Sequence, residues 1–266
     1  MGTVLSSGGS PVSQRGISVS INPAVDSTSF KYFSDTGVGV YYTNLNGLDS
    51  CTTYFFRAFA SNTIGTYYGS LNSFSILRLP EISTRPLSQI ASNSVVSGGQ
   101  ILSNGGTNIL SRGIAYGSSP NPTILGLIIT GGNRPGSFII TVGGLQPSTL
   151  YYLRAYATNG VGTAYGNEIS FTTSASLASG TTALPTGVTS IEASTGGNVV
   201  SDGGSAVTAR GVAYGLSSSP TTANFTTVNG AGTGLFVAAL TGLISGVSYF
   251  ARAYAINAVG VSYGIR

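Results

Sequence analysis

Side chains able to carry chemistry are scarce in this sequence. Its 266 residues include no histidine, so the commonest general base and metal ligand is missing. Lys31 is the single lysine and Cys51 the single cysteine. Serine is abundant, but a serine nucleophile needs a base beside it, and nothing in the sequence places one. Cys51 occupies a loop position that holds Ser148 and Gly246 in related segments, so we interpret it as an ordinary loop residue.

The carboxylates do not form a recognisable site either. All seven are spread along the chain: Asp26, Asp35, Asp49, Glu81, Glu168, Glu192 and Asp202. A glycosidase pair could still meet in space, but no local pairing supports one. Three of them, Asp26, Asp35 and Asp49, lack the D-x-D-x-D spacing of a calcium loop. Gly230–Gly234 lacks the Gly-Lys-Ser/Thr of a phosphate loop. We therefore predict no catalytic residue, no metal site and no cofactor, and a protein that is not an enzyme.

The charge pattern argues against two classes of partner. Charged residues make up 7% of the chain, and the net charge of +4 comes from isolated arginines. Nucleic-acid binding needs clustered cations, so we expect no nucleic-acid partner. No apolar run is long enough to span a bilayer, so we expect no membrane insertion. The opening MGTVLSSGGS shows no signal peptide.

Two arginine-centred segments each occur three times. Arg15, Arg112 and Arg210 begin the segments RGISVS, RGIAYG and RGVAYG, at spacings of 97 and 98 residues. A second set repeats the same two spacings, and its arginines are Arg57, Arg154 and Arg252. Two independent anchors with equal periods identify a tandem array of units of about a hundred residues.

Each unit has the pattern of a β-sandwich. Tyr151–Ala157 alternates between Tyr, Leu, Ala and Ala on one face and Tyr, Arg and Tyr on the other. Ser137–Val142 is rich in β-branched residues and ends at Gly143-Gly144. Short strands with frequent turns in units of this length favour a sandwich over other architectures.

A tyrosine at a fixed place supports the same fold. Tyr54, Tyr151 and Tyr249 each follow a Gly-Leu pair by six residues from the leucine. This is the spacing of a tyrosine corner, in which the hydroxyl bonds back to the preceding loop. An A-x-N-x-x-G turn then follows in all three units.

These motifs resemble those of a known family. The patterns G-L-x-P-x-T-x-Y-x-x-R-A-Y-A-x-N-x-x-G-x-x-Y-G and A-R-G-V-A-Y-G are similar to fibronectin type III-like repeats of the immunoglobulin superfold. Such repeats occur in surface proteins of Bacteroidota and in fibre or decoration proteins of their phages. Unit 1 departs most, with Val19 where the others have Tyr116 and Tyr214. The resemblance implies an all-β fold of three tandem sandwiches and specifies no single function.

The outer units are expected to be incomplete. We divide the chain into repeat 1 (1–78, lacking its N-terminal strand), repeat 2 (79–174), a linker (175–183) and repeat 3 (184–266, lacking the end of its last strand). Two explanations stay open: the chain is part of a longer protein, or a neighbouring chain donates the missing strand. An unpaired edge of this kind invites strand addition.

One exposed pattern remains as a candidate contact site. An aromatic–Arg–aromatic stripe recurs on the outward face of the sixth strand of each unit. Its members are Phe55, Arg57, Phe59, Tyr152, Arg154, Tyr156, Phe250, Arg252 and Tyr254. Stacking of the guanidinium between two rings would seal and stiffen the sheet. The alternative is a sticky strip for glycans or a protein neighbour.

The sequence as a whole predicts a non-enzymatic structural or adhesive protein on an external surface. We expect a phage virion component (fibre, tail or head decoration), because no export signal is visible. A fragment of a secreted bacterial cell-surface adhesin or filament is the alternative, followed by accessory modules of a carbohydrate-active enzyme. Expected partners are other virion or surface-assembly proteins and cell-surface glycans.

Overall fold

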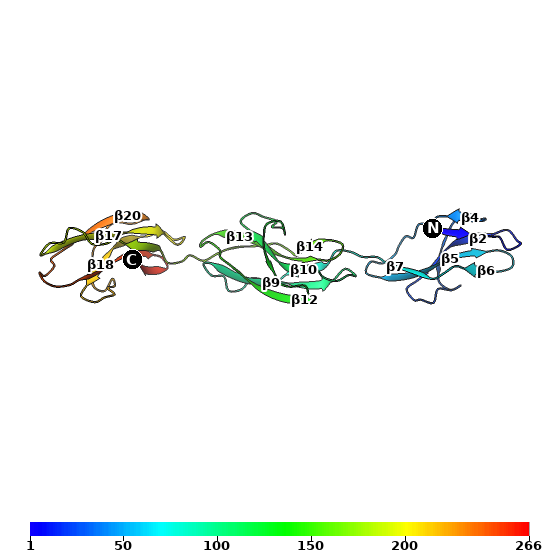
Figure 1. Ribbon diagram of the computed structural model, residues 1–266, viewed down its shortest axis with the longest axis horizontal. Coiled ribbons are helices and arrows are strands. Elements are labelled where there is room, and N and C mark those ends of the chain that lie inside the picture. Colours follow the sequence, from blue (N-terminus) through cyan, green and yellow to red (C-terminus); the bar gives the residue numbers. More distant parts are fainter. Residues whose placement is uncertain (266) are drawn as a thin grey trace.

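A computed structural model describes residues 1–265 as three β-domains arranged in a row (Figure 1). All regular elements in these residues are strands. The first and last residues of the described chain lie in the two outermost domains. The chain is a tandem of immunoglobulin/fibronectin III-like sandwiches, as the sequence predicts.

Domain 2 is the most complete of the three. Its strands are β8 (Glu81–Thr84), β9 (Ser94–Ser103), β10 (Ser111–Gly117), β11 (Leu127–Thr130), β12 (Gly136–Gly143), β13 (Leu150–Thr158), β14 (Thr163–Tyr165) and β15 (Ile169–Thr172). One sheet has the order β12-β9-β8, and the other has β11-β10-β13-β14 with β15 also paired to β13. Alternation along β12 buries Phe138, Ile140 and Val142 between the sheets. This antiparallel strand order is that of a fibronectin type III sandwich.

Domain 3 repeats this arrangement. Its strands are β16 (Ser179–Thr182), β17 (Glu192–Ser201), β18 (Ala209–Gly215), β19 (Phe225–Thr226), β20 (Gly234–Thr241), β21 (Phe250–Asn257) and β22 (Gly260–Tyr263). The sheets are β16-β17-β20 and β19-β18-β21-β22. The structure places β16 inside the segment 175–183 that the sequence analysis treats as a linker, because Gly180–Thr182 pair with β17.

Domain 1 has a reduced first sheet. Its strands are β1 (Gly2–Val4), β2 (Gln14–Ser20), β3 (Phe30–Phe33), β4 (Gly39–Tyr41), β5 (Thr53–Ser61), β6 (Thr66–Tyr68) and β7 (Asn72–Ser75). The large sheet β3-β2-β5-β6, with β7 on β5, is intact. The other sheet consists of β1 and β4 alone within residues 1–265. Its buried core is correspondingly small, comprising Ile17, Val19, Tyr41 and Tyr54.

The glycine of the repeated Arg-Gly pair allows an aromatic ring to pack on the sheet. A Cβ on Gly113 would collide with the Ile129 carbonyl oxygen and come within 2.8 Å of the Tyr156 ring. Gly16 and Gly211 have the same relation to the rings of Phe59 and Tyr254. The missing side chain of this glycine therefore leaves room for the aromatic ring of the adjacent strand.

The loop before each long strand is fixed by the repeated tyrosine. The hydroxyl oxygen of Tyr54 accepts a hydrogen bond from the Asp49 amide at 2.8 Å. Tyr151 and Tyr249 accept from the amides of Gln146 and Ile244, at 3.1 and 3.3 Å. Each bond reaches back five residues, as in a tyrosine corner.

The same loop also meets the next domain. Ser148 Oγ donates to the Gly204 carbonyl oxygen at 2.7 Å, which joins domains 2 and 3. At the first junction, a Cβ on Gly106 would lie 3.4 Å from Cys51 Cα. Cys51 and Ser148 have positive φ angles of 58° and 45°, and Gly246 has 76°. The position is thus a left-handed turn in all three domains, a conformation that glycine adopts without strain.

Candidate functional site: arginine–aromatic stripes and a groove in domain 1

Each stripe arginine stacks on a tyrosine of the adjacent strand. The sequence analysis expects it to stack instead on the two aromatic residues of its own strand. Arg154 lies over the ring of Tyr165 on β14, with its Cζ 4.0 Å from the ring centroid. Arg57 lies over Tyr68 at 5.4 Å, and Arg252 over Tyr263 at 4.7 Å. The stacking partner therefore lies on the neighbouring strand of the same sheet. The aromatic residues two positions before and after each arginine do not stack on it.

Two of these guanidinium groups are also tied to the backbone. Arg154 Nε donates to the Pro122 carbonyl at 2.6 Å, and Arg57 Nε donates to the Gly69 carbonyl at 2.7 Å. Because these donors are already engaged, fewer remain to bind an external ligand. This geometry is that of a clamp holding a loop and the edge strand to the sheet.

The third aromatic position of each stripe is buried. Phe59, Tyr156 and Tyr254 expose only 2%, 2% and 4% of their surface, because each packs on a strand glycine. Phe55 and Tyr152 are half-buried, and Phe250 is 36% exposed. The nine stripe residues thus leave one aromatic ring per domain at least partly accessible beside an engaged arginine.

A second set of arginines also stacks on aromatic rings, and two of its three members, Arg15 and Arg112, are buried. Arg15, Arg112 and Arg210 lie over the rings of Tyr41, Phe138 and Phe236, at 5.0, 4.8 and 5.4 Å from the ring centroids. Each donates to carbonyl oxygens of the loop preceding that ring. Burial lowers the pKa of Arg112, and the nearby Arg134 adds to the effect. These side chains hold loops in place.

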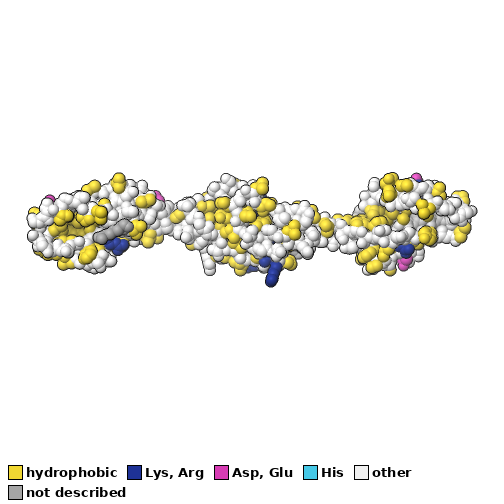
Figure 2. Space-filling view, in the orientation of Figure 1, with side chains coloured by type: hydrophobic (Ala, Val, Ile, Leu, Met, Phe, Trp, Pro, Cys, Tyr) yellow, Lys and Arg dark blue, Asp and Glu magenta, His cyan; other side chains and the backbone are white. Residues whose placement is uncertain are grey.

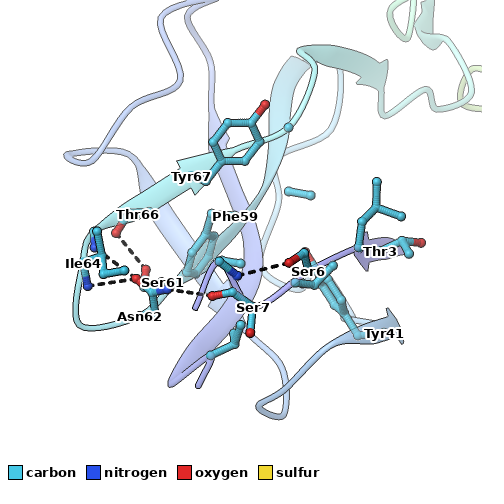
Figure 3. A pocket seen from close by; sticks show the side chains of 18 residues that line it. Thr3, Ser6, Ser7, Tyr41, Phe59, Ser61, Asn62, Ile64, Thr66 and Tyr67 are labelled. Carbon is cyan, nitrogen blue, oxygen red and sulfur yellow. Dashed lines mark hydrogen bonds between the residues drawn. The ribbon is translucent and has the colours of Figure 1, made fainter. Parts of the chain in front are cut away.

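Domain 1 contains a groove. It has a volume of about 510 Å³ and lies between β1 and the edge of the large sheet (Figure 3). Its walls include Val4, Tyr41, Ala58, Asn62 and Gly69, and no charged side chain lines it. Its chemistry therefore suits an uncharged occupant.

Apolar side chains at the groove are unusually exposed. Leu5, Ile64 and Tyr67 expose 93%, 76% and 80% of their surface. Their polar neighbour Asn62 donates from Nδ2 to the Ser7 carbonyl at 2.8 Å, as Figure 3 shows. The groove therefore combines an apolar rim with ordered backbone groups.

The carboxylates do not converge. Arg15 pairs with Asp35 at 2.8 Å, and Glu168 accepts from the Asn121 amide. Residues 1–265 contain no group of three or more His, Cys, Asp or Glu placed to hold a metal ion. Asp26 accepts hydrogen bonds from Thr28, which lower the pKa of that carboxyl. Figure 2 shows a face on which charged side chains are few.

No helix among the described residues has the length and apolar character needed to traverse a bilayer.

The sequence analysis identified the incomplete edge of repeat 1 but not the groove residues. The one sequence feature that could have identified the groove is Gly69, which corresponds to Gly166 and Gly264 in the other repeats. A Cβ on Gly166 would lie 2.5 Å from Thr84 N, and one on Gly264 would lie 2.7 Å from Thr182 Oγ1. On Gly69 it would meet nothing closer than Ala58, at 3.7 Å.

Comparisons with known proteins gave one result of three. No family model matches this chain, and no curated protein matches it. Among solved structures, the FN1–FN3 domains of chicken CNTN1 are 16% identical, with a TM-score of 0.37. That match covers 98% of this chain and 91% of the other. The strand order and pairing described above establish the chain as three tandem fibronectin III-like β-sandwiches.

Proposed function

We propose that this protein is a non-enzymatic rod that displays its domains on an external surface, as a fibre, tail or head-decoration component of a phage virion. The observation that supports this most is the linear arrangement of three sandwiches (Figure 1), with a hydrogen bond that joins domains 2 and 3. A linear array of domains extends far from its attachment point and presents the same contact surface several times. These properties suit a spacer or a multivalent binder better than an enzyme.

The surface chemistry fits such a role. Charged side chains are few on the face that Figure 2 shows. Six arginines stack on aromatic rings, and five of them also donate to carbonyl oxygens. Phe55, Tyr152 and Phe250 offer one partly accessible ring in each domain, a suitable platform for a glycan or a protein neighbour. Cell-surface glycans and other virion proteins are therefore the partners we propose.

Cys51 is the sole cysteine, so folding of the three domains requires no disulfide and no oxidising compartment. This favours a virion part assembled inside the host cell. A secreted bacterial adhesin or filament is the alternative, and accessory modules of a carbohydrate-active enzyme are a further one.

Immunogold electron microscopy with an antibody against domain 2 tests the proposal. We expect gold labels on purified virions at regular positions and none on uninfected cells. Labels confined to the surface of uninfected cells would contradict the virion role and favour the adhesin. Turnover of a polysaccharide by the purified chain, lost on substitution of a carboxylate, would contradict a non-enzymatic role.

A further inference from the structure

The groove of domain 1 is filled by a strand in both sister domains. In domain 2 the filling strand is β8, where the Ala155 amide donates to Thr84 Oγ1 at 3.0 Å. In domain 3 it is β16, where the Ala253 amide donates to Thr182 Oγ1 at 3.1 Å. The same chain therefore shows twice which kind of segment this site accepts.

A buried asparagine holds the segment that leads into each filling strand. Asn159 Nδ2 donates to the Arg78 carbonyl at 2.7 Å, and Asn257 Nδ2 donates to the Ser176 carbonyl at 2.8 Å. These two asparagines expose 2% and 5% of their surface. The counterpart Asn62 in domain 1 is only half-buried, because no segment of residues 1–265 covers it.

Domain 1 keeps the features that receive the strand. The Ala58 carbonyl accepts from the Gly69 amide at 2.8 Å, just as the Ala155 carbonyl accepts from Gly166 at 2.9 Å. In an antiparallel strand the amide and carbonyl of one residue point to the same side, so the Ala58 N–H faces the groove. No hydroxyl within residues 1–265 takes the place of Thr84 there.

Gly69 is the second retained feature. Its φ is not in the left-handed region, and the space around it is open, so nothing in domain 1 itself requires a glycine. The counterparts Gly166 and Gly264 are in near-contact with Thr84 and Thr182 of the filling strands. A glycine at position 69 is thus needed only when a strand occupies the groove.

We propose that domain 1 binds an extended segment of a separate polypeptide, which adds to β1 as an antiparallel third strand. Its threonine or serine hydroxyl accepts a hydrogen bond from the Ala58 N–H. A small or apolar residue two positions earlier takes the place of Ile82 or Gly180, opposite Val4. The inner face of this segment is uncharged, because no charged side chain lines the groove.

The register follows from the sister domains. Ile82, Ser83 and Thr84 pair with Ile101, Gln100 and Gly99 of β9. The equivalent residues of β1 are Val4, Thr3 and Gly2, which pair with β4 on their other side. A second copy of this chain is disfavoured as donor, because β8 and β16 are already held in their own domains at high effective concentration.

Fluorescence anisotropy with a labelled copy of the β8 segment, RLPEISTR (78–85), tests the proposal on the complete chain. We expect saturable binding to the wild-type protein. A peptide with valine at the place of Thr84 should bind about tenfold more weakly, the effect of one lost hydrogen bond. Slower exchange of the Ala58 amide on peptide addition, followed by NMR, would locate the site.

A matched pair of variants identifies the groove. Gly69→Ala places a methyl group where the strand must pass, and we expect binding to fall about tenfold or more while domain 1 unfolds at an unchanged temperature. Gly117→Ala adds the same methyl group in open space in domain 2 and should leave binding unchanged.

Several outcomes would overturn the proposal. They are the absence of saturable binding, equal binding by Gly69→Ala, or protection of the Ala58 amide without added peptide, which would mean that the groove is already filled. Concentration-dependent dimers that Gly69→Ala abolishes would identify a second copy as the occupant instead. None of these outcomes bears on where the protein is displayed, so the proposed function is tested separately.

Discussion

Arginine in this protein works mainly as a connector of loops. Two arginines in each domain place the guanidinium over an aromatic ring, and five of the six also donate to carbonyl oxygens. Only Arg15–Asp35 and Arg78–Glu81 form ion pairs within residues 1–265. A chain with few acidic residues thus satisfies its cations with backbone oxygens and π faces.

We expect Arg112→Met to destabilise domain 2 by about 2–4 kcal/mol, because a buried donor to the carbonyls of Gly131, Pro135 and Gly136 is lost. Urea unfolding followed by hydrogen exchange of β10–β12 measures the change. Arg85→Met, at an exposed position, is the control and should have little effect. Equal losses in the two variants would contradict a special role for Arg112.

Acid should weaken domain 1 through Asp35. Hydrogen bonds from Arg15 and Ser34 hold the pKa of this carboxyl below its ordinary value. Its contribution to stability is therefore complete above the ordinary value of about 3.9 and is lost as the pH falls through the lower folded value. The effect is modest and sensitive to salt, because the carboxylate is 70% exposed.

Thermal unfolding of domain 1 between pH 6 and pH 2 measures this dependence. We expect Asp35→Asn to flatten it, whereas Asp49→Asn, which removes the same charge in the same domain, should not. Identical acid profiles for wild type and Asp35→Asn would contradict this assignment.

At the scale of strands, the first sheet is the variable part of the domain. Domains 2 and 3 seat β8 and β16 against β9 and β17, and a threonine hydroxyl bonds each of them to the opposite sheet. In domain 1 the corresponding edge of β1 is unpaired within the described residues. In each complete sandwich this threonine hydroxyl is thus one of the side-chain hydrogen bonds that connect the two layers.

Amide exchange should reveal this connection. We expect the Ala58 amide to exchange about tenfold or more faster than those of Ala155 and Ala253, since it lacks their hydroxyl acceptor. Thr84→Val should accelerate exchange at Ala155, and Thr84→Ser, which keeps the hydroxyl, should not. NMR-detected exchange provides the measurement, and equal rates at all three alanines would contradict the assignment.

Local sequence patterns predicted much of each domain. They missed features that depend on contacts with residues far away in the sequence. Alternation and turn residues predicted strands at 137–142 and 151–157, which the structure confirms as parts of β12 and β13. β16 escaped detection because SGTT carries no apolar pattern, and pairing with β17 holds it in place. The burial of Tyr156 was also missed, because it depends on Gly113 of the adjacent strand.

Across the whole molecule, the junctions repeat one design. The loop before β5 or β13 meets a double-glycine turn of the following domain, at Gly106 and Gly204. The equivalent Gly9 of domain 1 and Gly246 of domain 3 lie in open space. Within residues 1–265, these two positions therefore contact no neighbouring domain.

We expect Gly204→Ala to bend or loosen the rod between domains 2 and 3, because the new methyl group would lie 2.5 Å from Ser148 Cβ. Small-angle X-ray scattering should report a shorter maximum dimension. Gly230→Ala is the matched control: it has a similar positive φ, of 91° against 78°, but open space around it. An unchanged scattering profile for Gly204→Ala would show that the Ser148 contact does not set the angle.

The direct succession of β15 and β16 determines how the rod bears tension. A pull between its ends passes from the last strand of domain 2, which ends at Thr172, into the first strand of domain 3, which begins at Ser179. β16 resists by shearing its antiparallel bonds to β17, and β8 resists in the same way against β9. Under tension, domains 2 and 3 would therefore each be held by the shear of their first strand against its neighbour.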